Sequence, residues 1–338
     1  MSDNMEYKNI KVEDDKDSEV KISGEISADS LNSYRERAIK NISTDVEIKG
    51  FRKGKVPEDV LIKNVGEMSV LQEAAELALS DAYPKIILEH KIEPLGHPQV
   101  SITKLAPKED LGFSITTAVM PKVTLPDYKT ISKKISSEKE EVKIEDKEVE
   151  EAVTNIQNSI AQGKGEKELP EVSDEFVKKL GDFKNVEDFK KKLKENLMLE
   201  KERLAKDKKR NRIADAIIEK SKISIPKLLI DGELERMLSQ FKADIEQSGL
   251  TYDKYLTEVK KTDEDIRKEW MPIAEKKAKL QLILNKIALE EKVKPEEDQV
   301  KKEMEHILSH HKDAPEERVR IFVETMLTNE KVFEFLEK

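Results

Sequence analysis

Two short stretches in the first third of the chain alternate hydrophobic and polar residues. Val20, Ile22 and Ile26 are separated by polar positions, and every second residue from 111 to 119 is apolar or threonine: Leu111, Phe113, Ile115, Thr117 and Val119. Neighbouring side chains of a strand point to opposite faces of a sheet, so each stretch predicts a half-buried β-strand.

The residues between these stretches follow a helical period instead. One apolar stripe contains Leu31, Tyr34, Ala38 and Ile42, and a second contains Val70, Leu71, Ala74, Ala75, Leu77 and Ala78. Strands and helices mixed without a regular βαβ repeat predict an α+β domain, a small antiparallel sheet with helices, that closes near Pro126.

The rest of the chain predicts an elongated all-α domain with helical arms. Residues 131–142 are rich in Lys, Ser and Glu and indicate a linker or extended connector, followed by a helix over residues 148–160 and a break over 162–170. Pro226, Pro295 and Pro315 mark helix starts, because the missing N–H of a first-turn proline would be unpaired there. We therefore place the N-terminal domain at residues 1–127 and the helical domain at 128–338, with a linker at 128–147.

Local signals refine this helical half. Thr262 and Asp265 fit a capping box ahead of a stripe of Ile266, Trp270 and Ile273. Residues 200–212 have a helical pattern in which Leu204 and Ala205 are nearly the only apolar side chains, so this stretch predicts a helix with no fully buried face. Later helices carry fuller stripes: Leu228, Leu234, Met237, Leu238 and Phe241, then Leu280, Ile283 and Ile287, then Val319, Phe322, Val323, Met326 and Leu327. Most of these residues are expected in helix packing, although short helical hairpins also leave apolar grooves open.

Composition favours long solvated helices. Of 338 residues, 39% are charged and only 5% aromatic, and the net charge of −9 makes a whole-surface attraction to nucleic acid unfavourable. The absence of cysteine excludes disulfides, thiolate metal sites and cysteine nucleophiles. The first residues are polar, and no run approaches the ~20 apolar residues that span a bilayer, so we expect a cytoplasmic protein without a membrane partner.

A basic loop stands out in this acidic chain. Residues 49–57, here called the basic loop, hold Lys49, Arg52, Lys53 and Lys55 without an acidic residue, and Gly50 and Gly54 permit the positive φ angles of a sharp turn. Phe51 lies at the tip, where an exposed ring beside cations suits a mixed surface of phosphates and an apolar pocket. The alternative is a solvated loop whose phenylalanine folds back onto its own domain. A nucleotide-binding loop does not fit, because the two glycines are one residue too close and Val56 occupies the place of the Ser or Thr that holds magnesium.

The basic loop carries a resemblance to a known family. Gly50, Phe51, Arg52, Lys53 and Gly54 with Pro57 resemble the Gly-Phe-Arg-x-Gly-x-x-Pro motif by which bacterial trigger factor docks beside the polypeptide exit of the large ribosomal subunit. Three further stretches are similar to segments of that family: residues 92–98, residues 169–181 with their Leu-Pro-Glu start, and residues 225–231, which look like the start of a helical arm. Together they extend over nearly the whole chain.

The resemblance implies an ATP-independent chaperone. Its ribosome-binding residues would be Gly50, Phe51, Arg52, Lys53, Gly54 and Pro57, its partners the protein and rRNA near the exit tunnel together with nascent or unfolded chains, and its free form a possible homodimer. No cofactor is implied. The family usually carries a prolyl-isomerase domain just before the Leu-Pro-Glu segment, but only residues 162–168 occupy that place, far fewer than the ~40 residues of a minimal domain. The resemblance therefore implies a variant without that domain.

Other candidate chemistry is weak. His306 and His310 share a helical face beside His311, but no third ligand is evident and solvated histidines are the simpler interpretation, so we expect no metal. No serine or acid forms a catalytic pattern, and we assign no catalytic residue. Trp270 and the methionines at 237, 304 and 326 fit core packing, while a flexible methionine surface would also suit varied clients. Two competing hypotheses stay open: a prolyl isomerase with its site elsewhere, and a purely structural helical scaffold.

Overall fold

The computed structural model describes residues 6–138, 142–164 and 168–338. By its internal contacts the chain forms two compact units. Unit 1 contains residues 1–124 and 222–281, and unit 2 contains residues 125–221 and 282–338. Each unit is described by itself below.

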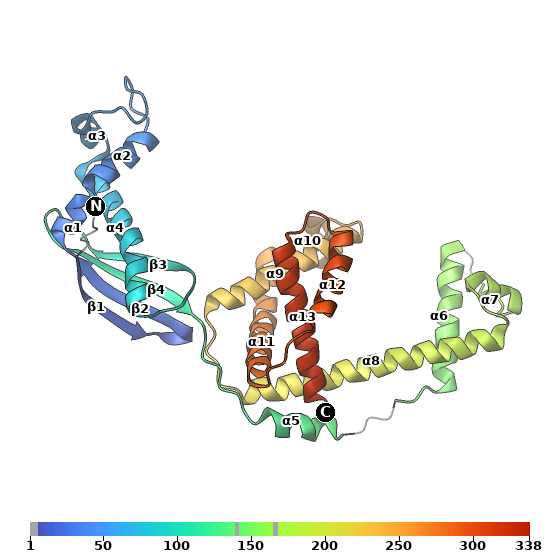
Figure 1. The fold of residues 1–338 in the computed structure, drawn as a ribbon. Helices are drawn as coiled ribbons and strands as arrows, with labels where there is room; N and C mark the ends of the chain where they lie inside the picture. The colour runs from blue at the N-terminus through green and yellow to red at the C-terminus, as the bar shows by residue number, and fades with distance from the viewer. Residues whose placement is uncertain (1–5, 139–141, 165–167) are drawn as a thin grey trace. The chain divides into compact units, whose positions relative to one another are not determined.

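Unit 1 begins with a four-stranded antiparallel sheet (Figure 1). The strands are β1 (Tyr7–Asp14), β2 (Glu19–Ile26), β3 (Pro94–Lys104) and β4 (Leu111–Val119), in the order β1-β2-β4-β3, and a short 3-10 turn, η1 (Lys16–Ser18), joins the first two. In the central pair Ile22 lies opposite Ile115, and both are fully buried. The two strands predicted from alternation are therefore confirmed as the centre of the sheet.

The long helix α4 (Glu67–Glu89) covers one face of this sheet, and its alanines and aliphatic residues pack on the buried strand residues. Three shorter helices, α1 (Ala28–Ser33), α2 (Arg35–Asp45) and α3 (Glu58–Val65), pack against α4, and Figure 1 shows α2 and α3 beyond the sheet. The stripe from Leu31 to Ile42 spans two helices instead of one, because the chain changes direction at Tyr34, which caps α1. Leu31, Tyr34 and Ala38 are still buried together, so the stripe identified the correct face.

Unit 1 also contains α9 (Lys227–Gln247), α10 (Tyr252–Val259) and the beginning of α11 (Asp263–Glu290). The capping box is confirmed: the Thr262 N–H donates to an Asp265 carboxylate oxygen at 2.9 Å, and the Asp265 N–H donates to the Thr262 hydroxyl at 3.1 Å. Trp270 packs in a core with Leu234, Leu238, Ile266 and Ala274, as expected for a core tryptophan. The predicted third stripe residue, Ile273, is wrong: it is 46% exposed, and Ala274 faces the core instead.

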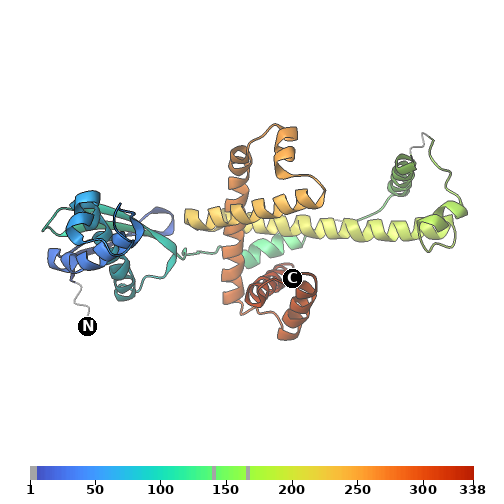
Figure 2. The ribbon, with the colours of Figure 1, turned by 90° about the horizontal axis from the view of Figure 1, so that it is seen from above.

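Unit 2 is entirely helical in the part that the structure describes. It comprises α5 (Tyr128–Ser136), α6 (Asp146–Lys164), α7 (Asp174–Leu180), α8 (Val186–Lys220), the end of α11, α12 (Glu297–His310) and α13 (Glu316–Leu336). Figure 2 shows α8 as one continuous rod with α7 at its first turns. A core of Val153, Val177 and Phe189 joins α6 and α7 to that end, and Val300, Val319 and Val323 join α12 to α13.

The sequence-based boundaries need two corrections in unit 2. The linker expected at residues 128–147 is helical at both ends, because residues 128–136 form α5, which Asp127 caps through the Thr130 N–H, and α6 begins at Asp146. Tyr128 and Ser132, four residues apart, are both buried on one face of this helix. The polar composition of the stretch gave no sign of this buried face. The break expected from residue 162 begins later, because α6 continues to Lys164. The domain boundary at residue 127 itself stays a prediction.

The solvated helix is confirmed. Within α8, Phe189 and Ile213 are buried, but no residue from 190 to 212 is. Pro226 and Pro315 lie directly before α9 and α13, and Pro295 lies two residues before α12, so all three prolines mark helix starts. In the ranges that the structure covers, no helix is both long and apolar enough to cross a membrane.

Candidate functional site

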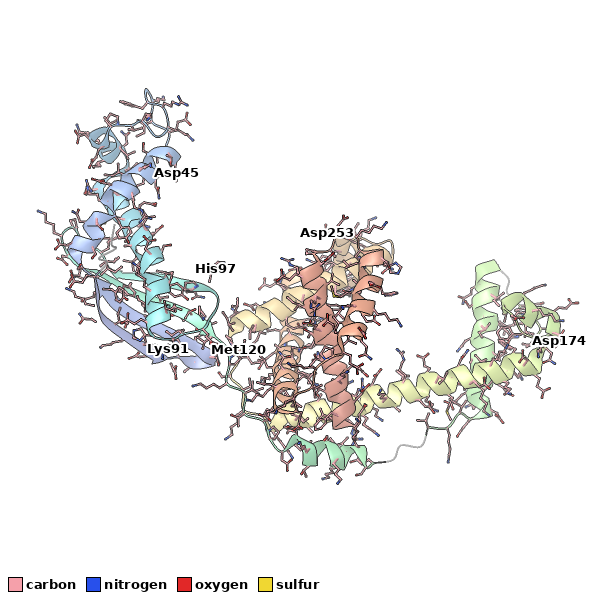
Figure 3. All side chains as sticks on the ribbon, viewed as in Figure 1. Asp45, Lys91, His97, Met120, Asp174 and Asp253 are labelled. Atoms are coloured by element: carbon pink, nitrogen blue, oxygen red, sulfur yellow. The ribbon has the colours of Figure 1, made fainter. Side chains whose placement is uncertain are left out.

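The basic loop connects α2 to α3 in unit 1. Figure 1 shows it beyond the ends of both helices, at the end of the helical layer that is farther from the sheet. Figure 3 labels Asp45, the last residue of α2, and the loop side chains beyond it point outward from the backbone. The loop therefore projects from the domain and does not cover it.

Backbone hydrogen bonds fold the loop into two consecutive turns. The Phe51 N–H donates to the Ile48 carbonyl at 3.1 Å, and the Lys55 N–H donates to the Arg52 carbonyl at 3.0 Å. The Gly54 N–H donates back to the Ser43 carbonyl in α2 at 2.7 Å, which ties the second turn to the helix. Gly50 and Gly54 have φ angles of +93° and +75°, so both turns need the left-handed conformation that glycine adopts without strain.

The Phe51 side chain lies at the surface and is not part of the hydrophobic core. Its side chain is 41% exposed, and it takes no part in the cluster of buried residues between the sheet and α4. The alternative in which the ring folds back into its own domain is therefore wrong. An aromatic ring held at this exposure by a hydrogen-bonded turn loses little further freedom when it enters a partner's pocket.

The four cations of the basic loop are available to a partner. Lys49, Arg52, Lys53 and Lys55 are all exposed, and within the described ranges none of their side chains forms an ion pair or a hydrogen bond. Four unpaired positive charges within seven positions produce a local positive potential although the whole chain is acidic. An anionic partner such as a phosphate backbone would be attracted to this end of unit 1.

Rigid helices carry the loop. Arg35 of α2 forms ion pairs with Glu58 of α3 and Glu67 of α4, and Asn41 donates to Glu73 of α4 at 3.0 Å. Pro57 is the residue before α3, in an extended conformation, and the side chain of Leu61 one turn later is completely buried. Both ends of the loop are thus anchored, and the motif residues Gly50, Phe51, Arg52, Lys53, Gly54 and Pro57 lie in one short segment.

A second set of exposed residues is large and apolar, and it lies on helices of unit 2 and on α9 and α11. They are Leu199 and Leu204 on α8, Ile321, Phe322 and Met326 on α13, and Leu228 and Ile273 on α9 and α11. Phe322, which the stripe analysis assigned to packing, is 57% exposed, while its neighbour Val323 is buried. Sequence reasoning missed Leu199 and Ile321, because a single apolar residue on a polar face gives no periodic signal.

The histidines of α12 form no richer arrangement. The rings of His306 and His310 lie edge to face with centroids 5.2 Å apart. Across the residues described, no group of three or more histidine and acidic side chains is arranged to hold a metal ion.

Comparison with known proteins finds one family similar to both the N-terminal and the C-terminal parts of the chain. Residues 8–156 match the family model described as bacterial trigger factor protein, and residues 185–337 match the model of the C-terminus of the same protein. The chain belongs to the bacterial trigger factor family. This is a family of chaperones, and the basic loop lies within the segment that matches its N-terminal model.

Individual relatives of the family agree. The trigger factor of Finegoldia magna is 26% identical over 82% of this chain and 82% of its own length, and that of Clostridium botulinum (strain Kyoto) is 22% identical over 97% and 98%. A solved structure, titled for promiscuous substrate recognition by the trigger factor chaperone, superposes with a TM-score of 0.51 at 17% identity and covers 97% of this chain and 99% of the other. At that identity the likeness shows the shared fold.

The chain is a variant of the trigger factor family without the prolyl-isomerase domain. Helices α6 and α7 follow one another closely, since α6 ends at Lys164 and α7 begins at Asp174. The two matches to family models leave only residues 157–184 between them, and the helices occupy most of that interval.

Proposed function

We propose that this trigger factor family member docks on the large ribosomal subunit near the polypeptide exit through Gly50, Phe51, Arg52, Lys53, Gly54 and Pro57. The observation that supports the proposal most directly is the geometry of the tip, where an exposed ring stands between unpaired cations on a loop anchored at both ends. The ring would enter an apolar pocket of a ribosomal protein. The cations would contact rRNA phosphates, which position the loop without reading sequence.

Ribosome pelleting tests this docking. The triple variant Phe51→Ala, Arg52→Ala, Lys53→Ala should lose co-sedimentation with ribosomes. A matched control, Lys21→Ala, Val100→Ala, Lys122→Ala, removes the same number of positive charges and one exposed apolar side chain from another part of unit 1 and should pellet like the original chain. Unchanged pelleting of the loop variant would refute the assignment.

Salt dependence separates the ionic part of docking from the apolar part. Each phosphate contact that is lost should reduce the slope of log K against log salt by roughly 0.7–0.9, so Arg52→Ala with Lys53→Ala should reduce it by about 1.5. Phe51→Ala should weaken binding equally at all salt concentrations, because a ring in a pocket releases no counterion. A slope unchanged in the double variant would show that the cations do not meet phosphates.

We further propose that nascent or unfolded chains are held on the exposed apolar residues of the helices. Each contact with a client segment contributes about 25 cal/mol per Å² of buried apolar surface, so isolated patches bind weakly and release readily. Holding by many weak contacts requires no ATP and no other cofactor. Dilution of an unfolded client into the protein should suppress its aggregation, and Phe322→Ser with Met326→Ser should reduce the effect. A structural scaffold would suppress nothing.

Two subsidiary expectations belong to this proposal. The chain should not accelerate prolyl isomerisation in a protease-coupled peptide assay, because the proposed mechanism involves no covalent or isomerising step. Away from ribosomes a homodimer is one possible free form, which sedimentation velocity distinguishes from a monomer. A rate above the uncatalysed value would favour the competing isomerase hypothesis.

A further inference from the structure

Residues 142–145, directly before α6, contact the middle of α8. Residues 142–145 have no regular secondary structure, and their burial alternates: Val142 and Ile144 are half-buried, while Lys143 and Glu145 are exposed. Alternation of buried and exposed residues is the pattern of an extended peptide that places one face against a surface. The surface here is the part of α8 in which no residue is buried.

Lysines of α8 bind the backbone of this segment and the acidic first turn of α6, which follows it. The Lys201 ammonium donates to the carbonyl of Lys143 at 2.7 Å and to both carboxylate oxygens of Glu148 at 2.8 and 3.1 Å. Lys194 donates to Asp146 at 2.8 Å. A bond to a main-chain carbonyl is one that any extended peptide can supply, whereas the bonds to carboxylates select acidic residues.

The apolar side chains of the segment lie over two hollows. Ile144 borders a hollow of about 540 Å³ together with Lys191, Lys194 and Met198 of α8. Val142 borders a second hollow of about 340 Å³ with Ala205, Lys206 and Lys209. Both hollows are open to solvent, so space for larger apolar side chains lies beside both positions of the segment.

Opposite charges meet at two points of the contact, Lys194 with Asp146 and Lys201 with Glu148, while Glu195, Glu202 and Glu337 also line the two hollows. The α8 face offers Lys191, Lys194 and Lys201, and the segment answers with Asp146 and Glu148. The ammonium groups hold the pKa of both carboxyls below their usual values, through Lys194 for Asp146 and Lys201 for Glu148. The segment therefore fits this face by main chain, apolar spacing and charge together.

We propose that the α8 face formed by Lys194, Met198, Lys201 and Ala205 is a peptide-binding groove that the chain's own residues 142–148 occupy. Its client ligand is an extended segment with apolar residues at alternate positions that leads into an acidic first turn of a helix, as the resident segment leads into α6. The resident segment competes with such clients and must be displaced before they bind. The identity of the ligand as a client rests on the proposed chaperone function, but peptide binding to the groove is measurable without it.

The test uses the full chain and a fluorescently labelled peptide with the sequence of residues 142–149. The variant Val142→Ser, Ile144→Ser removes the apolar side chains of the resident segment and should bind the peptide, as followed by fluorescence anisotropy. A tethered segment acts at an effective concentration on the order of 1 mM. A peptide whose Kd is about 0.1 mM should therefore bind the unaltered chain about tenfold more weakly than the variant.

Substitutions in the groove locate the binding. The double variant Val142→Ser, Ile144→Ser is here called the open variant. When Met198→Glu or Lys201→Glu is added to it, peptide binding should be abolished, whereas Leu199→Glu, on the opposite face of α8, should not affect it. Both groove residues lie where α8 is solvated, so the helix should keep its circular dichroism. Equal affinity of the open variant and the unaltered chain, or binding indifferent to Lys201→Glu, would overturn the proposal.

The outcome is separable from that of the proposed function. If the open variant binds no peptide while the chain still suppresses aggregation, the groove is refuted and the chaperone function stands. If the peptide binds as described but neither chain suppresses aggregation, the groove stands and the chaperone function fails. Ribosome pelleting should be equal for both chains, because the basic loop is unchanged.

Discussion

Arg210 offers the sharpest test of how unit 2 is held together. Its guanidinium donates two hydrogen bonds to Glu330 of α13, both at 2.7 Å, and two to Glu337, the residue that follows α13, at 2.7 and 3.3 Å. It also lies 5.3 Å from the centre of the Phe333 ring. The Arg210 side chain is only 13% exposed although it belongs to the solvated part of α8. Arg210 therefore joins the long helix to the C-terminal end of the chain, where Lys206 of α8 makes longer contacts of 3.8 and 3.9 Å with the same two carboxylates.

Replacement of Arg210 by alanine should cost about 2–3 kcal/mol. Breaking a buried ion pair by removing one partner costs about 3–5 kcal/mol, and exposed pairs contribute about 0–1 kcal/mol. The network lies between these limits, since Glu337 is 19% exposed and Glu330 is 46% exposed. For a unit of this size a loss of 1 kcal/mol lowers Tm by about 2–4 °C, so we expect a decrease of about 4–12 °C in the melting of unit 2.

Arg320→Ala is the matched control. Arg320 also lies on α13 and pairs with Glu297 and Glu324, but its side chain is 42% exposed against 13% for Arg210, and its loss should change stability by less than about 0.5 kcal/mol. Thermal melts followed by circular dichroism, with hydrogen exchange of α13, measure both variants. If Arg210→Ala is no less stable than Arg320→Ala, the argument from burial is wrong.

The pH dependence of this difference has a defined sign. Arg210 holds the pKa of Glu330 below its ordinary value of 4.5, so the stabilisation is present above pH 4.5 and is lost as the pH falls through the lower pKa of the folded state. The original chain and Arg210→Ala should therefore converge in stability in acid. A difference that persists at pH 2 would assign the effect to packing against Phe333.

Three further measurements test the loop and the arm. Ser43 has a buried hydroxyl without a hydrogen-bond partner in the described structure, so Ser43→Ala should stabilise unit 1 by up to about 1 kcal/mol in urea unfolding. Gly54→Ala forces a side chain into the left-handed region and should cost about 1–2 kcal/mol and weaken ribosome pelleting, whereas Gly232→Ala, within α9 with open space around it, should stabilise by about 0.5–1 kcal/mol. Burial and the carboxylate of Asp263 raise the pKa of Tyr252 to about 12, so its stabilisation should be complete below pH 10 and lost as the pH rises to 12, which absorbance at 295 nm follows by difference from Tyr252→Phe.

Local signals in the sequence predicted the elements well. Strands β2 and β4, the capping box of Thr262 and the proline-marked starts of α9 and α13 each depend on residues within one or two turns of one another. The basic loop is equally local, because its glycines and cations are adjacent in the chain. Its exposure is not local, since whether Phe51 turns inward depends on how α2 and α3 are anchored to α4.

Faces of helices were harder to predict than the helices themselves. Ile273 and Ala274 are neighbours, and the larger residue was the natural choice for the core, yet the small side chain of Ala274 permits close contact and is completely buried. Phe322 and Val323 show the same inversion on α13. A stripe identifies which 100° sector is apolar, but the partner helix decides which edge of that sector it covers.

The segment after α5 shows why a surface in another part of the chain is required to interpret a sequence. Val142 and Ile144 alternate with charged residues, which alone indicates a strand, yet no strand lies beside them in the described structure. Their partner is α8, some fifty residues later, whose half-buried Lys201 supplies the hydrogen bond that a neighbouring strand would otherwise provide. In the sequence alone, the lysines of α8 indicate a solvated helix face, and the acidic stretch that includes Asp146 and Glu148 indicates a linker. Their complementarity is evident only in the structure, where the two stretches contact each other. The residues that bind the α8 face from within the chain then indicate the kind of peptide that the face can bind from outside.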